Sequence, residues 1–458
     1  MDENRLRDID AFVAAEERNI IRDIARLVAI NSVEGESEEG APYGRAPREA
    51  LGLGLEIAKE LGLAVRNCED RIGYAQIGDA EDYLATITHL DVVPAGEGWK
   101  GDPFVLRERE GYLIGRGVMD DKGPSVLCLY ALKYLKERGI PLRYSVRAIL
   151  GSNEETGMED VRYYLDHYPA PVFCFSPDSG FPVCNGEKGI CRGRIVSKTK
   201  LDRIVDIRGG IAANVVPDKA EAWIRGERPE ASERVSVEEA DGLWHLTAKG
   251  VGGHASTPKG TINAIGVLVD YLLEKKLVGP DEESFLRLLT LLHKSWDGSG
   301  LGVEADDGLF EPLTIIGGVI GVEDGHIFQV IDSRYPTNTS GEKICARIRE
   351  VAGELAEVRM ESDAEPFYMS LENPAVRTLM TVYNGVTGDE AKPYTMGGGT
   401  YARGFPNGVS FGPEHPERPA PAFAGPIHGA DEAACWEYFR EALKIYILAL
   451  IELEKLDF

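Results

Sequence analysis

Five short segments of this chain carry the carboxylate and imidazole side chains that bind metal ions in proteins. Four of them follow an apolar run that is typical of a buried strand. Strand ends of an open α/β sheet meet at one edge, so we expect these side chains to converge there. Two imidazoles with several carboxylates would suit zinc, manganese or cobalt as divalent ions. The segments are residues 88–94, 115–124, 153–157, 176–178 and 427–432.

The inventory of these segments matches a site for two metal ions. Such a site needs one carboxylate that bridges the two ions. Each ion also needs a terminal imidazole and a terminal carboxylate. Asp120 is the candidate bridge. His89 and Asp178 would hold one ion, and Glu155 and His428 would hold the other. Each motif alone is more typical of structural or surface residues, so the prediction depends on their joint occurrence.

Three further acidic residues lie beside these candidates. Asp91 is two residues from His89 on the same face of a strand, where it could accept the free ring N–H of that histidine. Glu154 precedes a candidate ligand and could act as a general base, with its pKa raised by burial. We interpret Asp121 as a solvated residue at a helix start.

Composition limits the classes of partner. The chain has 458 residues and a formal net charge of −26, which argues against nucleic acid because phosphate binding needs clustered Lys and Arg. No apolar stretch reaches the ~18–20 residues that span a bilayer, and no secretory signal is visible at the N-terminus. The seven cysteines form no Cys-x-x-Cys pair and are typical of reduced core residues. We expect a cytoplasmic protein with no membrane partner.

The apolar spacing predicts an α/β fold with a mostly parallel or mixed sheet and a large insertion. Helical spacing over the first sixty residues leads into strands and helices that alternate up to Phe175. Alternating strands then follow, with turn signals such as Asp241-Gly242, two helices and a hairpin around Asp324-Gly325. We expect a discontinuous domain over residues 1–186 and 371–458, an inserted α+β domain over 187–370, and a final helix from Asp431 to about Lys455.

The motifs, in this order, resemble those of the M20 family of metallopeptidases, most similarly the PepV-type (Sapep-like) bacterial dipeptidases. The resemblance covers nearly the whole chain and implies a catalytic domain, an inserted lid and two divalent metal ions, with zinc expected and manganese or cobalt as alternatives. The strings that carry it are HLDVVP at 89–94, GRGVMDDKGP at 115–124, NEETG at 153–157, VGGHASTP at 251–258, DSRYP at 332–336 and GGGTYAR at 397–403.

The resemblance also implies roles for single residues. It assigns the five ligands as above and makes Asp91 and Glu154 catalytic. From the lid, His254 would stabilise the oxyanion, while Asn214 and Arg334 would lie near the substrate, with Arg334 binding its carboxylate. Gly399 and Thr400 are further candidates for substrate contact. Two departures are Ala255, where relatives often have glycine, and the proline-rich stretch 413–426 with His415, which we do not expect to be a ligand.

These features predict a metal-dependent hydrolase that cleaves the amide bond of dipeptides or other short peptides, with Glu154 as the general base. We expect a monomer whose lid imitates a dimer partner, so that the lid histidine comes from the same chain. The alternative is an N-acyl-amino-acid deacylase. Asp178 favours the peptidase, because in the resemblance Asp here accompanies dipeptidases and aminopeptidases, whereas Glu accompanies deacylases. A catalytically inactive binding protein is a remote alternative that Glu154 and the five ligands disfavour.

Overall fold

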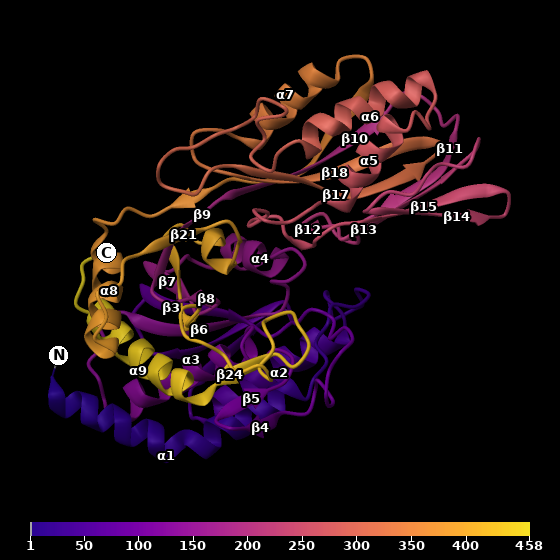
Figure 1. Cartoon of the computed structure of the whole chain (residues 1–458). Coiled ribbons are helices and arrows are strands. Elements are labelled where there is room, and N and C mark those ends of the chain that lie inside the picture. Colours follow the sequence, from indigo (N-terminus) through magenta and orange to yellow (C-terminus); the bar gives the residue numbers. More distant parts are fainter. Residues whose placement is uncertain (1) are drawn as a thin grey trace. The chain divides into compact units, whose positions relative to one another are not determined.

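The computed structural model describes residues 2–458 and divides into two compact units (Figure 1). Unit 1 comprises residues 2–185, 369–394 and 399–458, and unit 2 comprises residues 186–368 and 395–398. The short return of the chain to unit 2 at 395–398 is not visible in the sequence pattern. Among the described residues, no helix has the length and apolar character needed to cross a bilayer.

Unit 1 is built on a mixed sheet with the strand order β1-β2-β6-β3-β7-β22-β9. The central strand β3 runs parallel to both β6 and β7, and β22 runs parallel to β7, whereas β1, β2 and β9 pair antiparallel. All seven residues of β3 are buried, as expected for a central parallel strand. The strands are β1 (Ala64–Cys68), β2 (Ile72–Ile77), β3 (Tyr83–His89), β6 (Ser145–Gly151), β7 (Phe173–Ser176), β9 (Val183–Glu187) and β22 (Gly408–Phe411).

Helices cover both faces of this sheet. The larger core contains α1 (Glu3–Val28), α2 (Arg45–Glu60), α3 (Lys122–Glu137), α8 (Pro374–Thr387) and α9 (Trp436–Leu453). The opposite face packs against α4 (Glu159–His167) and the 3₁₀ turn η1 (Tyr401–Gly404). Along β3, Leu84 belongs to the first core, while Ala85 and Ile87 belong to the second. The α/β class predicted from the sequence is therefore confirmed.

A small antiparallel sheet stands apart from the main one and joins two distant parts of the chain. It has the order β24-β5-β4, and β24 pairs with β5 so that Ala433 lies opposite Ile114. This pairing corrects two expectations. The last helix begins at Trp436 and not at Asp431, and the 115–124 segment follows a strand of this small sheet and not of the main one. The strands are β4 (Arg107–Arg109), β5 (Tyr112–Ile114) and β24 (Ala433–Cys435); β8 (Ser179–Gly180) pairs separately with β23 (Pro413–Glu414).

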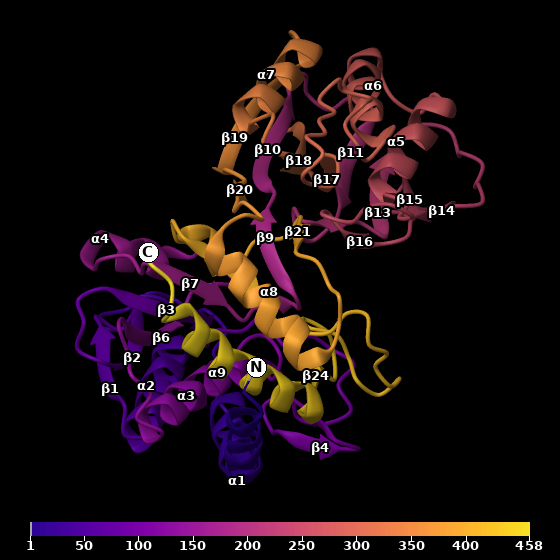
Figure 2. The same cartoon turned by 90° about the vertical axis from the view of Figure 1, so that its left-hand side faces the viewer.

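Unit 2 is an antiparallel sheet with the order β14-β15-β13-β11-β17-β18-β10-β19, packed against three helices (Figure 2). The helices are α5 (Ala264–Glu274), α6 (Pro280–His293) and α7 (Gly341–Ala352). The strands are β10 (Gly189–Ser197), β11 (Ile204–Gly209), β13 (Lys219–Ile224), β14 (Val235–Ala240), β15 (Leu243–Lys249), β17 (Thr314–Glu323), β18 (His326–Tyr335) and β19 (Ala356–Ala364); β12 (Val215–Val216) pairs with β16 (Gly253–His254), β20 (Phe367–Tyr368) pairs with β9, and β21 (Tyr394–Met396) crosses between the units.

The two hairpin turns predicted in unit 2 are confirmed. Asp241 and Gly242, between β14 and β15, have φ values of 53° and 77°. Asp324 and Gly325, between β17 and β18, have φ values of 50° and 80°. Positive φ at both central residues matches the right-handed twist of the flanking strands, and Asp-Gly adopts it readily.

Candidate metal centre and active site

His89 is the last residue of β3, and the sheet places its imidazole in the interior of unit 1. The side chain is 1% exposed. Its Nδ1 lies 3.0 Å from the backbone carbonyl of Asp91, which can only accept, so Nδ1 keeps a proton and Nε2 is the nitrogen that can lose its proton to bind a cation. Burial lowers the pKa of His89, but Asp120 and Asp91 outweigh it and raise that pKa well above the usual value. A cation at Nε2 would compete with this proton.

Asp120 lies between the two histidines, in the loop that precedes α3. Its Oδ1 is 2.9 Å from His89 Nε2, and its Oδ2 is 2.8 Å from His428 Nε2. Burial raises the pKa of Asp120, but hydrogen bonds from His428 and His89 outweigh it, so that the pKa falls below the usual value. One carboxylate that offers an oxygen to each of two imidazoles has the arrangement of a bridging ligand.

Glu154 and Glu155 follow β6 and enter the same cluster from the neighbouring strand. Both backbone N–H groups donate to the carboxylate of Asp91, over 3.2 Å and 3.1 Å. The carboxylate Oδ1 of Asp91 also lies 3.5 Å from His89 Nδ1, the partner expected for it, and the backbone carbonyl of Asp91 is nearer to that nitrogen at 3.0 Å. Burial and the charge of Asp178 raise the pKa of Glu154 well above its usual value.

The remaining candidate ligands come from β7 and from a long loop. Asp178, two residues after β7, has Oδ2 3.9 Å from His89 Nε2, and burial together with Asp120 raises its pKa well above the usual value. His428 lies in the loop between β23 and β24, with Nε2 3.2 Å from Glu155 Oε1. Its side chain is 51% exposed and its φ is +59°. The carboxylates of Asp120 and Glu155 raise the pKa of His428 to about 11.

Asp121 is not the solvated helix-start residue that the sequence suggested. Its side chain is fully buried, and Oδ2 accepts the backbone N–H of His89 over 3.2 Å. Burial and the charge of Asp178 raise the pKa of Asp121 well above its usual value. The carboxyl group therefore supports the backbone at the end of β3.

The donor set fits divalent cations. His89, Glu154 and Asp178 form one group whose ligand atoms lie within 4.8 Å of one another, and His89, Asp120 and Glu155 form a second. The polar neighbours of His89 Nε2 and Glu155 Oε1 within this cluster are themselves candidate ligands, Asp120 at 2.9 Å and His428 at 3.2 Å. Several carboxylates buried together cost free energy unless cations neutralise them. Oxygen and imidazole donors of this kind suit zinc, manganese and cobalt.

The lid candidates lie in unit 2. His254 on β16 pairs with Val215 on β12, and its Nδ1 is 2.7 Å from the Ser256 hydroxyl. Ala255 donates its N–H to the carbonyl of Asn214 over 2.9 Å, so Asn214 and His254 lie close together where β12 and β16 pair. The imidazole of His254 is exposed.

Arg334, near the end of β18, is 3% exposed and rigidly held. Nε donates to Asp332 Oδ1 over 2.6 Å, Nη2 to Asp332 Oδ2 over 3.3 Å, and Nη1 to the Gly397 carbonyl over 3.0 Å. A guanidinium has five N–H groups, so these contacts fix its plane and leave one N–H on each of Nη1 and Nη2 for a further acceptor.

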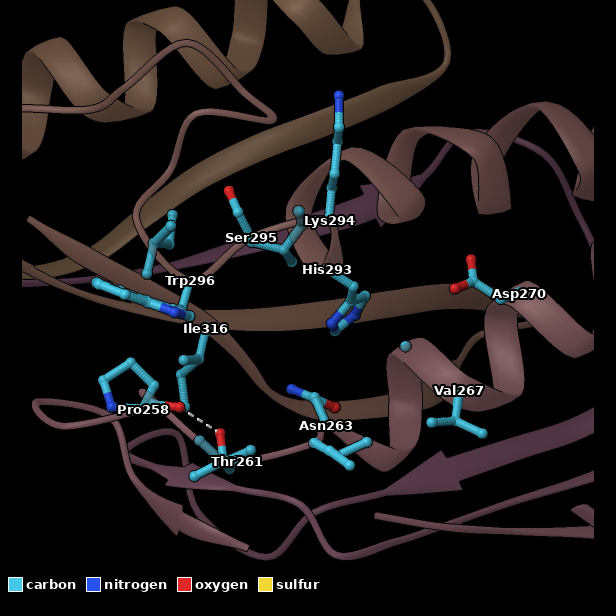
Figure 3. A pocket seen from close by; sticks show the side chains of 15 residues that line it. Pro258, Thr261, Asn263, Val267, Asp270, His293, Lys294, Ser295, Trp296 and Ile316 are labelled. Carbon is cyan, nitrogen blue, oxygen red and sulfur yellow. Dashed lines mark hydrogen bonds between the residues drawn. The ribbon is translucent and has the colours of Figure 1, made fainter. Parts of the chain in front are cut away.

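Next to Val216 of β12, unit 2 contains a cavity of about 330 Å³ (Figure 3). Val216 of β12 lines it, as do Ile262, Trp296 and Ile316. Figure 3 shows the imidazole of His293, at the end of α6, turned into this space toward Asn263. The β12–β16 pair therefore borders this cavity at Val216, which also packs with Ala255 and Ile316.

The other predicted residues have structural contacts in unit 1. The Thr400 hydroxyl lies 2.8 Å from the Ser410 hydroxyl and caps η1 by accepting the N–H of Ala402 over 3.1 Å, with Gly399 just before it. His415, which we did not expect to be a ligand, has Nε2 3.2 Å from Glu441.

Sequence reasoning missed two residues beside the cluster. Tyr401 packs the edge of its ring against His89 at 6.1 Å between centroids, and its hydroxyl donates to Asp160. Glu432, although inside a quoted segment, was given no role. No short sequence pattern marks either contact, because the partners of Tyr401 and Glu432 lie more than 200 positions away in the chain.

Two imidazoles and several carboxylates gathered from the ends of β3, β6 and β7 and from two loops are typical of the class of metal-dependent hydrolases. The profile of peptidase family M20/M25/M40 matches residues 85–452, and the chain belongs to this family. It is a metallopeptidase, as the sequence motifs predicted.

Individual relatives extend this likeness over nearly the whole chain. The chain is 33% identical to the Beta-Ala-Xaa dipeptidase of Lactobacillus delbrueckii subsp. lactis, over 95% of this chain and 96% of the relative. Its fold is similar to that of human carnosine dipeptidase 1, with a TM-score of 0.63 and 15% identity over 98% and 99% of the two chains. It is also similar to an M20 family metallo-carboxypeptidase of Sulfolobus solfataricus, with a TM-score of 0.58 and 15% identity over 95% and 99%.

Proposed function

We propose that this metallopeptidase is a PepV-type dipeptidase that binds two divalent ions, with zinc as the native metal. The observation that carries the proposal is Asp120, whose two carboxylate oxygens lie 2.9 Å and 2.8 Å from the imidazoles of His89 and His428. In the proposed ligand set, His89 and Asp178 hold one ion, Glu155 and His428 hold the other, and Asp120 binds both.

Glu154 acts as the general base. When bound, two divalent ions lower the pKa of a water molecule and polarise a carbonyl group. Glu154 accepts a proton from the attacking water and returns it to the leaving amine. The geometry supports this role, because a carboxylate oxygen of Glu154 lies within 4.8 Å of ligand atoms of His89 and Asp178. Asp91 assists by fixing the backbone of Glu154 and Glu155 through two N–H groups.

Residues of unit 2, together with Gly399 and Thr400 of unit 1, supply the substrate contacts. His254 stabilises the oxyanion, a type of contact worth about 3–4 kcal/mol per donor. The fixed guanidinium of Arg334 binds the C-terminal carboxylate of the substrate through its remaining N–H groups. Asn214, Gly399 and Thr400 line the substrate path. A dipeptide substrate is supported by the dipeptidase names of the relatives and by Asp178, the residue type that accompanies dipeptidases in the family resemblance.

The protein works as a cytoplasmic monomer that binds neither nucleic acid nor membranes. Its seven free cysteines, six of them buried, are compatible with a reducing compartment. The long insert imitates a partner subunit, so His254 acts in the chain that carries it. Mixing inactive Glu154→Gln chains with inactive His254→Ala chains tests this, because recovered activity requires a histidine supplied by another chain and contradicts the monomer.

The decisive assay uses metal-depleted protein, supplied again with zinc, manganese or cobalt, against dipeptides, tripeptides and N-acyl amino acids. We expect two ions per chain and at least about tenfold higher kcat/KM for dipeptides than for the other classes, a preference of about 1.4 kcal/mol. Preference for N-acyl amino acids would make the enzyme a deacylase. Metal binding without hydrolysis of any class would make it an inactive binding protein.

A further inference from the structure

Glu432 is a fully buried carboxylate next to the cluster, and its four donors all come from the loop that carries Asp120. Oε1 accepts the backbone N–H groups of Met119 and Asp120 over 3.0 Å and 3.3 Å. Oε2 accepts the backbone N–H of Gly117 over 3.1 Å and an Nη1–H of Arg116 over 2.6 Å. We infer that Glu432 is a positioning residue that sets the distance between the ligands Asp120 and His428. The inference rests on the ligand set proposed above.

The position of Glu432 in the fold explains why one side chain can do this. The strands β5 and β24 pair as far as Ile114 and Ala433, and the N–H of Gly115 then donates to the carbonyl of Glu432 over 3.0 Å. Beyond that point the backbones no longer pair. The side chain of Glu432 continues the contact by accepting the next available N–H groups up to Asp120 itself. The loop that carries Asp120 is thereby joined to the end of the loop that carries His428, at Glu432.

Arg116 ties a third segment to the same point. Besides Glu432, its guanidinium donates through Nη2 to the carbonyls of Pro94 and Ala95, over 3.4 Å and 3.2 Å. These carbonyls follow the strand end that carries His89. Arg116 is 1% exposed, so the ion pair with Glu432 is shielded from water and is stronger than a surface pair. The pair connects the segments that carry three of the five proposed ligands.

His428 has particular need of such an anchor. Its side chain is half exposed, and its φ of +59° is a conformation that residues other than glycine adopt at a cost. It lies four residues before Glu432 in a long loop. Without the anchor, we expect His428 and Asp120 to vary in separation, which would weaken the ion that both would hold.

The test is Glu432→Gln, which nearly preserves shape but replaces one acceptor oxygen by an NH₂ donor. That donor would face Gly117 N–H or Arg116, which are donors themselves. We expect the dissociation constant for the more weakly bound Zn²⁺, measured by calorimetric titration, to rise about 10–100-fold, the usual effect of losing a residue that orients metal ligands. The visible spectrum of the Co²⁺-substituted protein should change as well.

Unit 2 contains a matched control. Glu282 is 2% exposed and likewise accepts four N–H groups, from Gly279, Asp202, Arg203 and Ile204. Glu282→Gln should therefore lower the melting temperature without changing Zn²⁺ affinity or the Co²⁺ spectrum. If Glu432→Gln behaves in the same way, with Zn²⁺ affinity within twofold of the parent, Glu432 is merely structural and the inference is wrong.

Arg116→Lys keeps the test decisive if Glu432→Gln does not fold. Lysine retains the charge opposite Glu432 but cannot also donate to both Pro94 and Ala95, so we expect a smaller rise in the Zn²⁺ dissociation constant, of about threefold to tenfold. Unchanged affinity in Arg116→Lys would also overturn the inference. A parent protein that binds fewer than two ions would instead contradict the ligand set, so the two failures are distinguishable.

Discussion

Glu154 and Glu155 are neighbours in the chain, but the proposal gives them different tasks, and one substitution separates them. Glu154→Gln should retain two ions per chain and lose about 10²–10⁴-fold in kcat, the usual effect of removing a general base. Metal analysis and steady-state kinetics of the same preparation measure both quantities. Turnover within tenfold of the parent would exclude Glu154 as the base.

Asp120 should be the most costly ligand to remove. Because it would bind both ions, Asp120→Ala should leave less metal per chain than His89→Ala or His428→Ala, each of which would affect one ion most directly. Metal content after gel filtration provides the comparison. A folded Asp120→Ala protein that still holds two ions would show that another carboxylate bridges.

Arg334 and Arg192 form a matched pair, because both guanidinium groups bond to Asp332. Arg334 is buried and its guanidinium is also held by the Gly397 carbonyl, whereas the side chain of Arg192 is 43% exposed. Arg334→Lys should raise KM for dipeptides with a free C-terminal carboxylate by about tenfold and have little effect on amidated ones, since lysine cannot bind a carboxylate bidentately. Arg192→Lys should change neither. Equal effects on both substrate types would remove Arg334 from carboxylate binding.

At the residue scale, local sequence predicted which side chains would converge but not all of what holds them. His89, Asp120 and Glu155 could be named because each follows a recognisable motif, and the structure brings their ligand atoms within 4.8 Å. The carboxylate of Asp91 lies 3.5 Å from the ring nitrogen of His89, the partner predicted for it, but its contacts with the backbone N–H groups of Glu154 and Glu155 were not predicted. Glu432 could not be assigned at all, since its partners lie more than 300 residues earlier and no short pattern encodes that contact.

At the scale of elements, His293 at the end of α6 should make the stability of the fold depend on pH. The side-chain N–H groups of Gln329 both donate to backbone carbonyls, over 2.9 Å and 3.1 Å, so its Oε1 accepts a weak bond from His293 Nε2 at 3.4 Å. Burial lowers the pKa of His293 to about 4, although the Gln329 bond opposes the shift.

The direction of this pH effect on stability follows from proton binding. Between pH 6.5 and about 4 the unfolded chain protonates His293 and the folded chain does not, so stability decreases as the pH falls through this window. The loss is up to about 3 kcal/mol, at about 1.4 kcal/mol per pH unit. Urea unfolding of the parent and of His293→Gln at pH 7 and pH 4.5 measures it. On going from pH 7 to pH 4.5, we expect the parent to lose more unfolding free energy than His293→Gln does. Equal losses in the two proteins would contradict the prediction.

Elements with a clear apolar period or with typical turn residues could be predicted from the sequence. Strands whose bounds depend on pairing with a distant strand could not. The hairpin turns at Asp241-Gly242 and Asp324-Gly325 need positive φ values that Asp-Gly supplies. The region after Asp431 has helical spacing, yet β24 pairs with β5 and delays α9 to Trp436. Short buried elements such as β22 (Gly408–Phe411) have too few residues to show a period.

At the scale of the whole molecule, all five proposed ligands lie in unit 1, so metal should stabilise the two units unequally. We expect a chelator to lower the melting transition of unit 1 and to leave that of unit 2 nearly unchanged, because a ligand stabilises only the structure that binds it. At a free ion concentration of a hundred times the dissociation constant, the effect is about 2.7 kcal/mol per site.

Scanning calorimetry with and without chelator measures both transitions. Glu282→Gln identifies the transition of unit 2, because that substitution removes contacts there alone. Equal displacement of the two transitions by the chelator would show that the units unfold together or that metal also binds in unit 2.

The way in which the chain enters and leaves unit 2 has a consequence for how such enzymes diversify. Glu187 pairs with Phe367 and Gly186 with Tyr368, so the two ends of the insert are adjacent on one antiparallel strand pair. An insert with adjacent ends can be replaced by recombination without reordering the strands of its host. The segment 395–398 restricts this freedom, because Met396 accepts the N–H of Lys188 and Gly397 accepts from Arg334. A transplanted lid would have to bring a compatible version of these four residues, so the two pieces should be inherited together.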